Sequence, residues 1–126
     1  MDSNADMLAL GKAWIAAWNA RDLERILAMY SEDAEMTSDG ITRLGFTVLG
    51  SLRGKQNLRA YWSAALTRLP DLHFTPTGFF TSPNSVVVAY VNDRGQAICE
   101  YLRVSPHGAS AGLIVQGSAN HQVPAA

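Results

Sequence analysis

The sequence has very little of the chemistry that disulfides and metal sites require. It contains a single cysteine, Cys99, so no intrachain disulfide can form, and its three histidines make no cluster with the spacing of a zinc site. No apolar run approaches the ~20 residues that a membrane-spanning helix needs. We therefore expect a protein that requires no metal and no cofactor and that has no membrane as a partner.

Neither sign of charge dominates the sequence. Ten basic and eleven acidic residues give a formal net charge of −1, and the basic residues are scattered along the chain. A nucleic-acid-binding domain usually presents a basic face, so nucleic acid is disfavoured as a partner. The acidic first six residues differ from the basic start of a signal peptide, and we expect a cytoplasmic protein.

The apolar content is that of a folded domain. Hydrophobic residues make up 48% of the 126 residues, which is enough to build one core without covalent cross-links. We expect a single domain over residues 1–126. The segment 119–126 lacks hydrophobic periodicity and is expected to fray as a tail.

Apolar residues at helical spacing predict three helices, over residues 5–20, 22–30 and 55–69. Asp22 is expected to cap the second helix, and Pro70 to end the third.

The rest of the sequence predicts β-structure. Strands are expected over residues 34–38, 72–81, 85–92, 96–104 and 110–118, with a turn at 31–33 and a short strand or flap within 41–53. Pro76 and Gly78 mark the strand at 72–81 as an edge strand or a bulged one. Helices followed by strands predict an α+β fold, with an antiparallel meander packed on the helices.

One strand has apolar residues on both of its faces. Residues 86–91 read Val-Val-Val-Ala-Tyr-Val, and a strand of this kind needs cover on both sides. The helices cover one side. A second copy of the chain is the simplest cover for the other, which predicts a homodimer through the outer face of the sheet.

Three segments carry a resemblance to a known family. Residues 14–23, Trp-Ile-Ala-Ala-Trp-Asn-Ala-Arg-Asp-Leu, resemble the first-helix signature of SnoaL-like and ketosteroid-isomerase-like proteins, which belong to the nuclear-transport-factor-2-like (NTF2-like) superfamily. Residues 29–34 resemble the entry into the first strand of these proteins, and residues 52–55 the start of their third helix. The resemblance covers roughly residues 7–118.

The resemblance implies a cone-shaped, curved antiparallel sheet packed on three N-terminal helices, the cystatin-like or NTF2-like fold. It also implies a homodimer packed through the outer sheet face. It does not define a function, because this scaffold carries unrelated chemistries and also non-catalytic roles.

Glu100 is the main catalytic candidate. Side chains alternate along a strand, so Glu100 shares a face with Ile98 and Leu102, whereas Cys99 and Arg103 take the opposite face. Burial among apolar residues would raise the pKa of Glu100 and suit it to act as acid, base or hydrogen-bond donor. The position also matches, by resemblance, the strand acid of ketosteroid isomerases. A solvent-facing or structurally paired Glu100 is the alternative.

Asp39 and His73 are candidate partners for Glu100. Asp39 stands at the end of the first predicted strand. His73 is a candidate general base, because imidazole groups as a class can exchange protons near neutral pH. The resemblance places the isomerase aspartate at Ser38, and a shift of one residue on a strand reverses the face. Asp39 also begins an Asp-Gly turn pair, and His73 equally suits a solvent-facing position, so both interpretations stay open.

Apolar and aromatic residues are expected to shape a pocket. They are Trp14, Trp18, Tyr30, Met36, Trp62, Leu66 and Leu102. By resemblance, Trp14 takes the place of a helix-1 tyrosine that donates to the oxyanion in ketosteroid isomerases, and an indole N–H can donate but cannot ionise. Packing in the core is the alternative for these aromatic residues.

The sequence thus predicts a protein that binds a small hydrophobic molecule. The leading hypothesis is cofactor-independent proton transfer on a carbonyl-containing substrate, as in an isomerase, cyclase or dehydratase. The alternative is a non-catalytic ligand-binding or dimerisation module.

Overall fold

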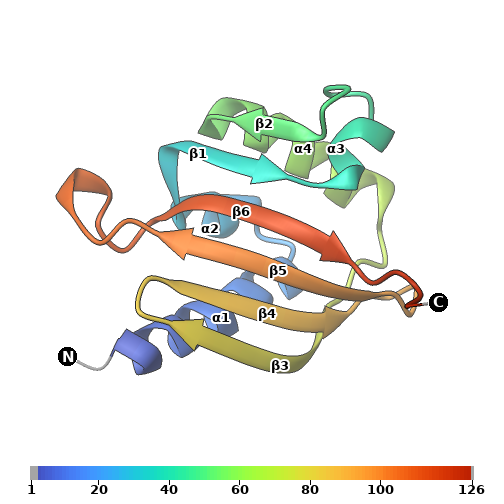
Figure 1. Ribbon diagram of the computed structural model, residues 1–126. Coiled ribbons are helices and arrows are strands. Elements are labelled where there is room, and N and C mark those ends of the chain that lie inside the picture. The colour runs from blue at the N-terminus through green and yellow to red at the C-terminus, as the bar shows by residue number, and fades with distance from the viewer. Residues whose placement is uncertain (1–2, 126) are drawn as a thin grey trace.

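A computed structural model describes residues 3–125 as a curved sheet folded around a layer of helices (Figure 1). The strands are β1 (Tyr30–Thr37), β2 (Ser51–Arg53), β3 (Thr75–Ser82), β4 (Ser85–Val91), β5 (Ala97–Val104) and β6 (Ile114–His121). The helices are α1 (Ser3–Asn19), α2 (Leu23–Ala28), α3 (Asp39–Arg43), α4 (Lys55–Arg68) and the short 3₁₀ helix η1 (Gly108–Ser110). The predicted α+β class is confirmed.

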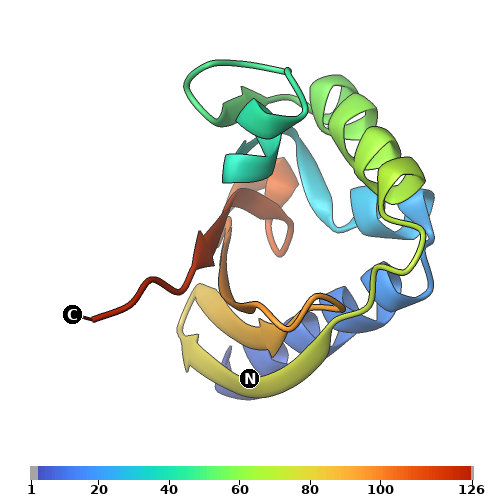
Figure 2. The ribbon, with the colours of Figure 1, turned by 90° about the vertical axis from the view of Figure 1, so that its right-hand side faces the viewer.

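The six strands form one sheet in the order β2-β1-β6-β5-β4-β3. Four of the five neighbouring pairs are antiparallel, but β1 and β6 are parallel. The expectation of a wholly antiparallel sheet is corrected here, because the last strand returns to lie beside the first. Figure 2, which views the sheet from its end, shows that the sheet is curved and that helices α1, α2 and α4 lie on its concave side.

The three predicted helices are present, with changes at their ends. The carboxylate of Asp22 accepts a hydrogen bond from the backbone N–H of Arg25 at 3.1 Å, which caps α2 as predicted. α2 ends at Ala28, two residues earlier than expected, and Tyr30 begins β1. α4 ends at Arg68, two residues before Pro70. No helix among residues 3–125 is long and apolar enough to cross a membrane.

The segment from residue 31 to residue 43 differs most from the sequence prediction. Residues 31–33 belong to β1 and form no turn, and the pairing of β1 with β6 shifts between Tyr30 and Glu35. The break expected at Asp39 is the helix α3. Ser38 caps α3, since its hydroxyl accepts a hydrogen bond from the backbone N–H of Gly40 at 3.2 Å.

The C-terminal strands follow the predicted meander. β3 is the edge strand, and its pairing with β4 shifts between Pro76 and Gly78, as these two residues predicted. β6 lies later than expected, because η1 occupies the start of the predicted strand. Residues 119–121 continue β6 and pair with β5, whereas residues 122–125 have no regular structure.

Two polar side chains at and just beyond the end of α1 form hydrogen bonds to the end of α4 and to the segment that follows it. The amide of Asn19 donates to the backbone oxygen of Phe74 at 2.9 Å and accepts from its N–H at 2.8 Å. The guanidinium of Arg21 donates to the carbonyl oxygens of Leu66 and Leu69. These contacts satisfy carbonyl groups at the end of α4 and fix the position of α1 relative to α4.

Candidate functional site

A cavity of about 340 Å³ lies between the inner face of the sheet and the helices. Cavities of roughly 300–1,000 Å³ are typical for small-molecule ligands. Its mouth is marked by exposed lining residues on α3 and on the turn between β4 and β5, namely Arg43, Asp93, Arg94 and Gln96. The site is therefore a pocket that opens at one end of the cone.

The wall of the cavity is largely aromatic. Trp14 and Phe74 stack with ring centres 5.6 Å apart, and Phe74 stacks in turn on Tyr90 at 4.2 Å. Trp18 meets Trp62 edge-on at 5.6 Å. All of these residues line the cavity, together with Tyr30, Met36, Tyr61, Leu72 and Ile98. The wall offers apolar surface and ring faces to a ligand.

Glu100 is buried in this wall, with only 2% of its surface exposed. The hydroxyl of Tyr90 donates a hydrogen bond to Oε1 of Glu100 at 3.2 Å, but Oε2 has no partner among the described residues. Burial raises the pKa of Glu100 to about 8, and the hydrogen bond from Tyr90 lowers it by a smaller amount. Glu100 is therefore mostly protonated at pH 7 and can donate a hydrogen bond into the cavity.

Three tyrosine hydroxyls surround this carboxyl group. Burial and the charge that Glu100 carries when ionised both raise the pKa of Tyr30, Tyr61 and Tyr90. These hydroxyls consequently stay protonated at physiological pH. The Tyr30 hydroxyl accepts a hydrogen bond from Trp14 Nε1 at 3.0 Å, and its own proton has no acceptor among the described residues.

A second buried polar group in the wall has no partner. Trp18 is 6% exposed, and its indole N–H makes no hydrogen bond to any described residue. A buried donor without an acceptor is costly, and a bound ligand or water can satisfy it. With Oε2 of Glu100, the cavity thus contains two polar atoms that are free to bind a ligand.

The structure does not bring the two other catalytic candidates to the cavity. Asp39 is exposed at the first position of α3, because Ser38 turns inward to cap the helix. Ser38 lines the cavity and accepts a hydrogen bond from the Tyr61 hydroxyl at 3.4 Å. The resemblance had placed the isomerase aspartate at this position. His73 is exposed and lies outside the lining, because its buried neighbours on either side face inward.

Most of the expected pocket residues do line the cavity. Trp14, Trp18, Tyr30, Met36 and Trp62 do so. Leu66 and Leu102 are buried in the core but lie outside the lining.

The sequence did not predict the polar residues at the mouth of the cavity. These residues are Arg43, the turn residues Asn92, Asp93, Arg94 and Gln96, and His121. The signal was the charged segment Asp-Arg-Gly at residues 93–95, between the strands predicted over residues 85–92 and 96–104, and no role in the site was assigned to it. Residue 121 was assigned to a fraying tail, whereas it lies in β6.

Comparison with known proteins identifies the family. The SnoaL-like domain model matches residues 12–111. A SnoaL-like protein of unknown function from Burkholderia thailandensis shares 33% sequence identity, with a TM-score of 0.85 over 94% of this chain and 96% of that one. The chain belongs to the SnoaL-like family. A comparison with curated proteins returned no match.

More distant structures share the fold of this SnoaL-like chain. A proposed ketosteroid isomerase from Kribbella flavida is 15% identical, with a TM-score of 0.71 over 98% of this chain and 83% of that one. A proposed polyketide cyclase from Sinorhizobium meliloti is 12% identical, with a TM-score of 0.73 over 95% of this chain and all of that one. At these identities the likeness shows the fold alone, and it confirms the NTF2-like architecture.

Proposed function

We propose that this SnoaL-like protein binds a small, largely apolar molecule with a carbonyl or hydroxyl oxygen, and that Glu100 transfers a proton to or from it without a cofactor. The observation that carries the proposal is the buried carboxyl group of Glu100, which lines an aromatic cavity and has a free Oε2 and a pKa of about 8. A catalytic acid works best when its pKa lies near the operating pH.

One carboxyl group is enough for the reaction types considered. In a dehydration, the proton of Glu100 goes to the departing hydroxyl, which leaves as water, and the resulting carboxylate takes a proton from the neighbouring carbon. In an isomerisation, Glu100 gives its proton to one atom of the conjugated system, and the resulting carboxylate takes a proton from a different atom of that system. Tyr30 and Trp18 supply hydrogen bonds to an oxygen that gains negative charge.

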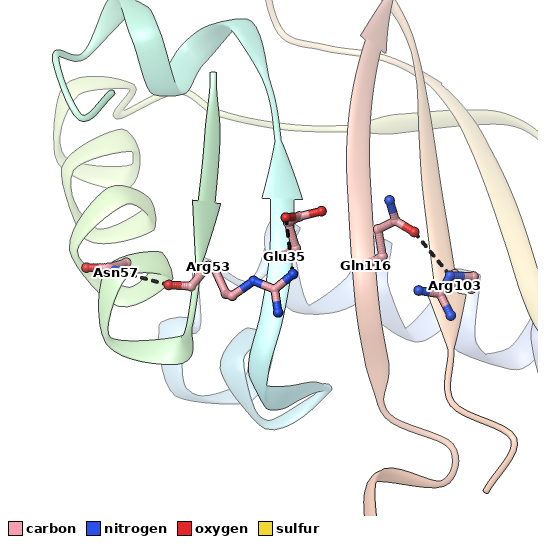
Figure 3. A network of polar contacts seen from close by, with 5 residues as sticks. All are labelled: Glu35, Arg53, Asn57, Arg103 and Gln116. Carbon is pink, nitrogen blue, oxygen red and sulfur yellow. Dashed lines mark hydrogen bonds and ion pairs between the residues drawn. The ribbon is translucent and has the colours of Figure 1, made fainter. Parts of the chain in front are cut away.

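The matched variants Glu100→Gln and Glu35→Gln test this proposal. Exchange of the α-protons of 4-tert-butylcyclohexanone in deuterated buffer, followed by NMR, measures proton transfer directly. We expect wild type to accelerate exchange and Glu100→Gln to be slower by about 100-fold or more. Glu35 lies on the outer face of the sheet (Figure 3), so Glu35→Gln is expected to behave as wild type.

The alternative function, a non-catalytic binding module, is favoured by one observation. Ser38, and no carboxylate, occupies the cavity position at the end of β1, so Glu100 has no second buried carboxyl partner among residues 3–125. Ketone binding without faster exchange would support the module and remove the catalytic part of the proposal. Exchange in Glu100→Gln at the wild-type rate would remove Glu100 from the mechanism.

We also propose that the protein is a homodimer through the outer face of the sheet. On that face Val87 lies between Phe80 and Tyr101 on the neighbouring strands, and Phe80 is 64% exposed. Next to this apolar strip the face is polar, with side-chain contacts from Arg53 to Glu35 and from Arg103 to Gln116 (Figure 3). An apolar centre beside a polar border is the usual anatomy of an interface, and a second copy covers the strip with an identical one.

A further inference from the structure

Two arginines at the mouth of the cavity have no acidic partner among residues 3–125. Arg43, at the end of α3, and Arg94, in the turn between β4 and β5, both line the cavity. The ion pairs among residues 3–125 involve other basic side chains, on Glu24, Glu32 and Glu35. The guanidinium groups of Arg43 and Arg94 are therefore free to bind an anion.

The turn that carries Arg94 is held in place by a buried asparagine. Asn92 is 6% exposed, and its Oδ1 accepts from the backbone N–H groups of Arg94 and Gln96, each at 3.0 Å. The amide of Asn92 donates to Oε1 of Gln96 at 2.9 Å, and Arg94 donates to the same oxygen at 3.4 Å. Gly95 supplies the positive φ of 76° that the turn requires. Arg94 is thus positioned at the mouth before any ligand binds, which lowers the entropic cost of binding.

The charge of Arg43 acts on the polar groups inside the cavity. Arg43 lines the cavity, and its charge lowers the pKa of Tyr61, against the larger opposite effect of burial. α3 is packed closely here, because a Cβ on Gly40 would lie 2.4 Å from the Tyr61 hydroxyl. Arg43 and Arg94 thus approach the mouth from two different elements of the fold.

The other ionisable groups that line the mouth are Asp93 and His121. With a neutral imidazole, two guanidinium groups and one carboxylate leave this end of the cavity with one net positive charge. The chain as a whole has a formal charge of −1. The mouth therefore carries a net positive charge, although the formal charge of the whole chain is negative. It borders a cavity whose wall is largely aromatic.

We propose that the ligand of this cavity is an amphipathic acid, whose apolar body lies against the aromatic wall and whose carboxylate is bound by Arg43 and Arg94 at the mouth. A guanidinium group matches a carboxylate in shape and binds it through two parallel hydrogen bonds. The inference rests on the proposed function only in that the cavity binds a small molecule. It does not require that Glu100 be catalytic.

Calorimetric titration with 4-cyclohexylbutanoate and its uncharged amide tests the inference. The two probes share the apolar body and differ mainly in charge. We expect the acid to bind wild type about fivefold more tightly than the amide, the scale of an exposed charge pair. In the double variant Arg43→Gln/Arg94→Gln this preference is lost and the affinity for the amide is unchanged. Added salt is expected to weaken binding of the acid alone.

Two further variants test the direction of the expected change in affinity and its specificity for the mouth. Asp93→Asn removes the opposing charge, so it is expected to strengthen binding of the acid and to leave the amide unaffected. Arg25 is exposed on α2 and lies outside the cavity lining, so Arg25→Gln is the control and is expected to bind both probes as wild type does.

The outcomes distinguish a failure of the anion site from a failure of the small-molecule cavity on which it depends. If the amide binds wild type as tightly as the acid, or if the double variant keeps the preference, the anion site is wrong and the binding cavity stands. If neither probe binds at 10-fold excess over millimolar protein, both the anion site and the small-molecule cavity are overturned.

Discussion

Tyr90 and Glu100 are diagonal neighbours on adjacent strands. Tyr90 pairs with Ile98 and Glu100 pairs with Val88, and all four side chains are buried on the inner face of the sheet. Diagonal neighbours of this kind lie within reach of long and aromatic side chains. The register of β4 and β5 therefore places the Tyr90 hydroxyl beside one oxygen of Glu100, and the other oxygen is left for a ligand.

Replacing Tyr90 with Phe is expected to raise the pKa of Glu100 above its value of about 8. The hydroxyl of Tyr90 stabilises the ionised carboxylate, and its loss leaves burial unopposed. The variant is also expected to lose about 1 kcal/mol of stability. Titration of the Glu100 carboxyl carbon by NMR measures the shift. Tyr61→Phe is the control, since the Tyr61 hydroxyl bonds to Ser38, and a fall in the pKa of Glu100 in Tyr90→Phe would contradict the assignment.

Glu100 is expected to make the protein less stable as the pH rises from about 4.5 to about 8. In this range the unfolded chain has lost the proton, because the ordinary pKa is 4.5, whereas the folded protein keeps it. The folded state then binds more protons, so the free energy of unfolding falls with pH, by at most about 1.4 kcal/mol per pH unit. Below the window both states are protonated, and above it both are ionised.

Urea unfolding of wild type and Glu100→Gln at pH 5, 6, 7 and 8 measures this contribution. The difference between the two proteins isolates the contribution of Glu100 from that of the other ionisable groups. We expect Glu100→Gln to gain stability relative to wild type as the pH rises. A constant difference across the series would show that Glu100 ionises normally in the folded protein.

Replacing Gly40 with Ala is expected to destabilise the protein by about 1–3 kcal/mol, because the new methyl group would lie 2.4 Å from the Tyr61 hydroxyl. Helix propensity alone predicts the opposite sign, since Gly40 lies within α3. Chemical unfolding measures the change. In a Tyr61→Phe background the clashing oxygen is gone, and the same substitution is expected to cost little. An equal cost in both backgrounds would place the strain elsewhere.

The proposed homodimer is expected to dissociate when a charge is placed at the centre of its apolar strip. Val87→Lys puts an ammonium group between Phe80 and Tyr101, where a second copy would bury it. Light scattering at micromolar concentration is expected to give a dimer for wild type and a monomer for this variant. Thr67→Lys adds the same charge on the exposed face of α4 and is expected to remain dimeric. A monomeric wild type would refute the proposal directly.

The strands and long helices could be predicted because their apolar residues repeat at a regular period. The alternation in β5 alone placed Glu100 inward and Cys99 and Arg103 outward, as the structure has them. The sequence of residues 31–43 carried no such period. There the hydroxyl of Ser38 accepts a hydrogen bond from the backbone N–H of Gly40 and caps the short helix α3, in which Asp39 is exposed and lies outside the cavity lining.

The unpredicted part of the site is assembled from distant segments. Arg43 and His121 lie almost 80 positions apart along the chain and line the same cavity. No local pattern links an α3 residue to the last strand, because the parallel pairing of β1 with β6 creates the relation. Polar residues around an opening depend on the three-dimensional path of the chain, whereas buried apolar residues are marked locally by their spacing.

All three tryptophans of the chain line the same cavity. They are Trp14, Trp18 and Trp62. The tryptophan emission of the protein, excited at a wavelength that tyrosine does not absorb, is consequently a reporter of occupancy at one place in the fold. Libraries of ultraviolet-transparent compounds can be screened by fluorescence quenching or spectral shift, without a label and without knowledge of the reaction.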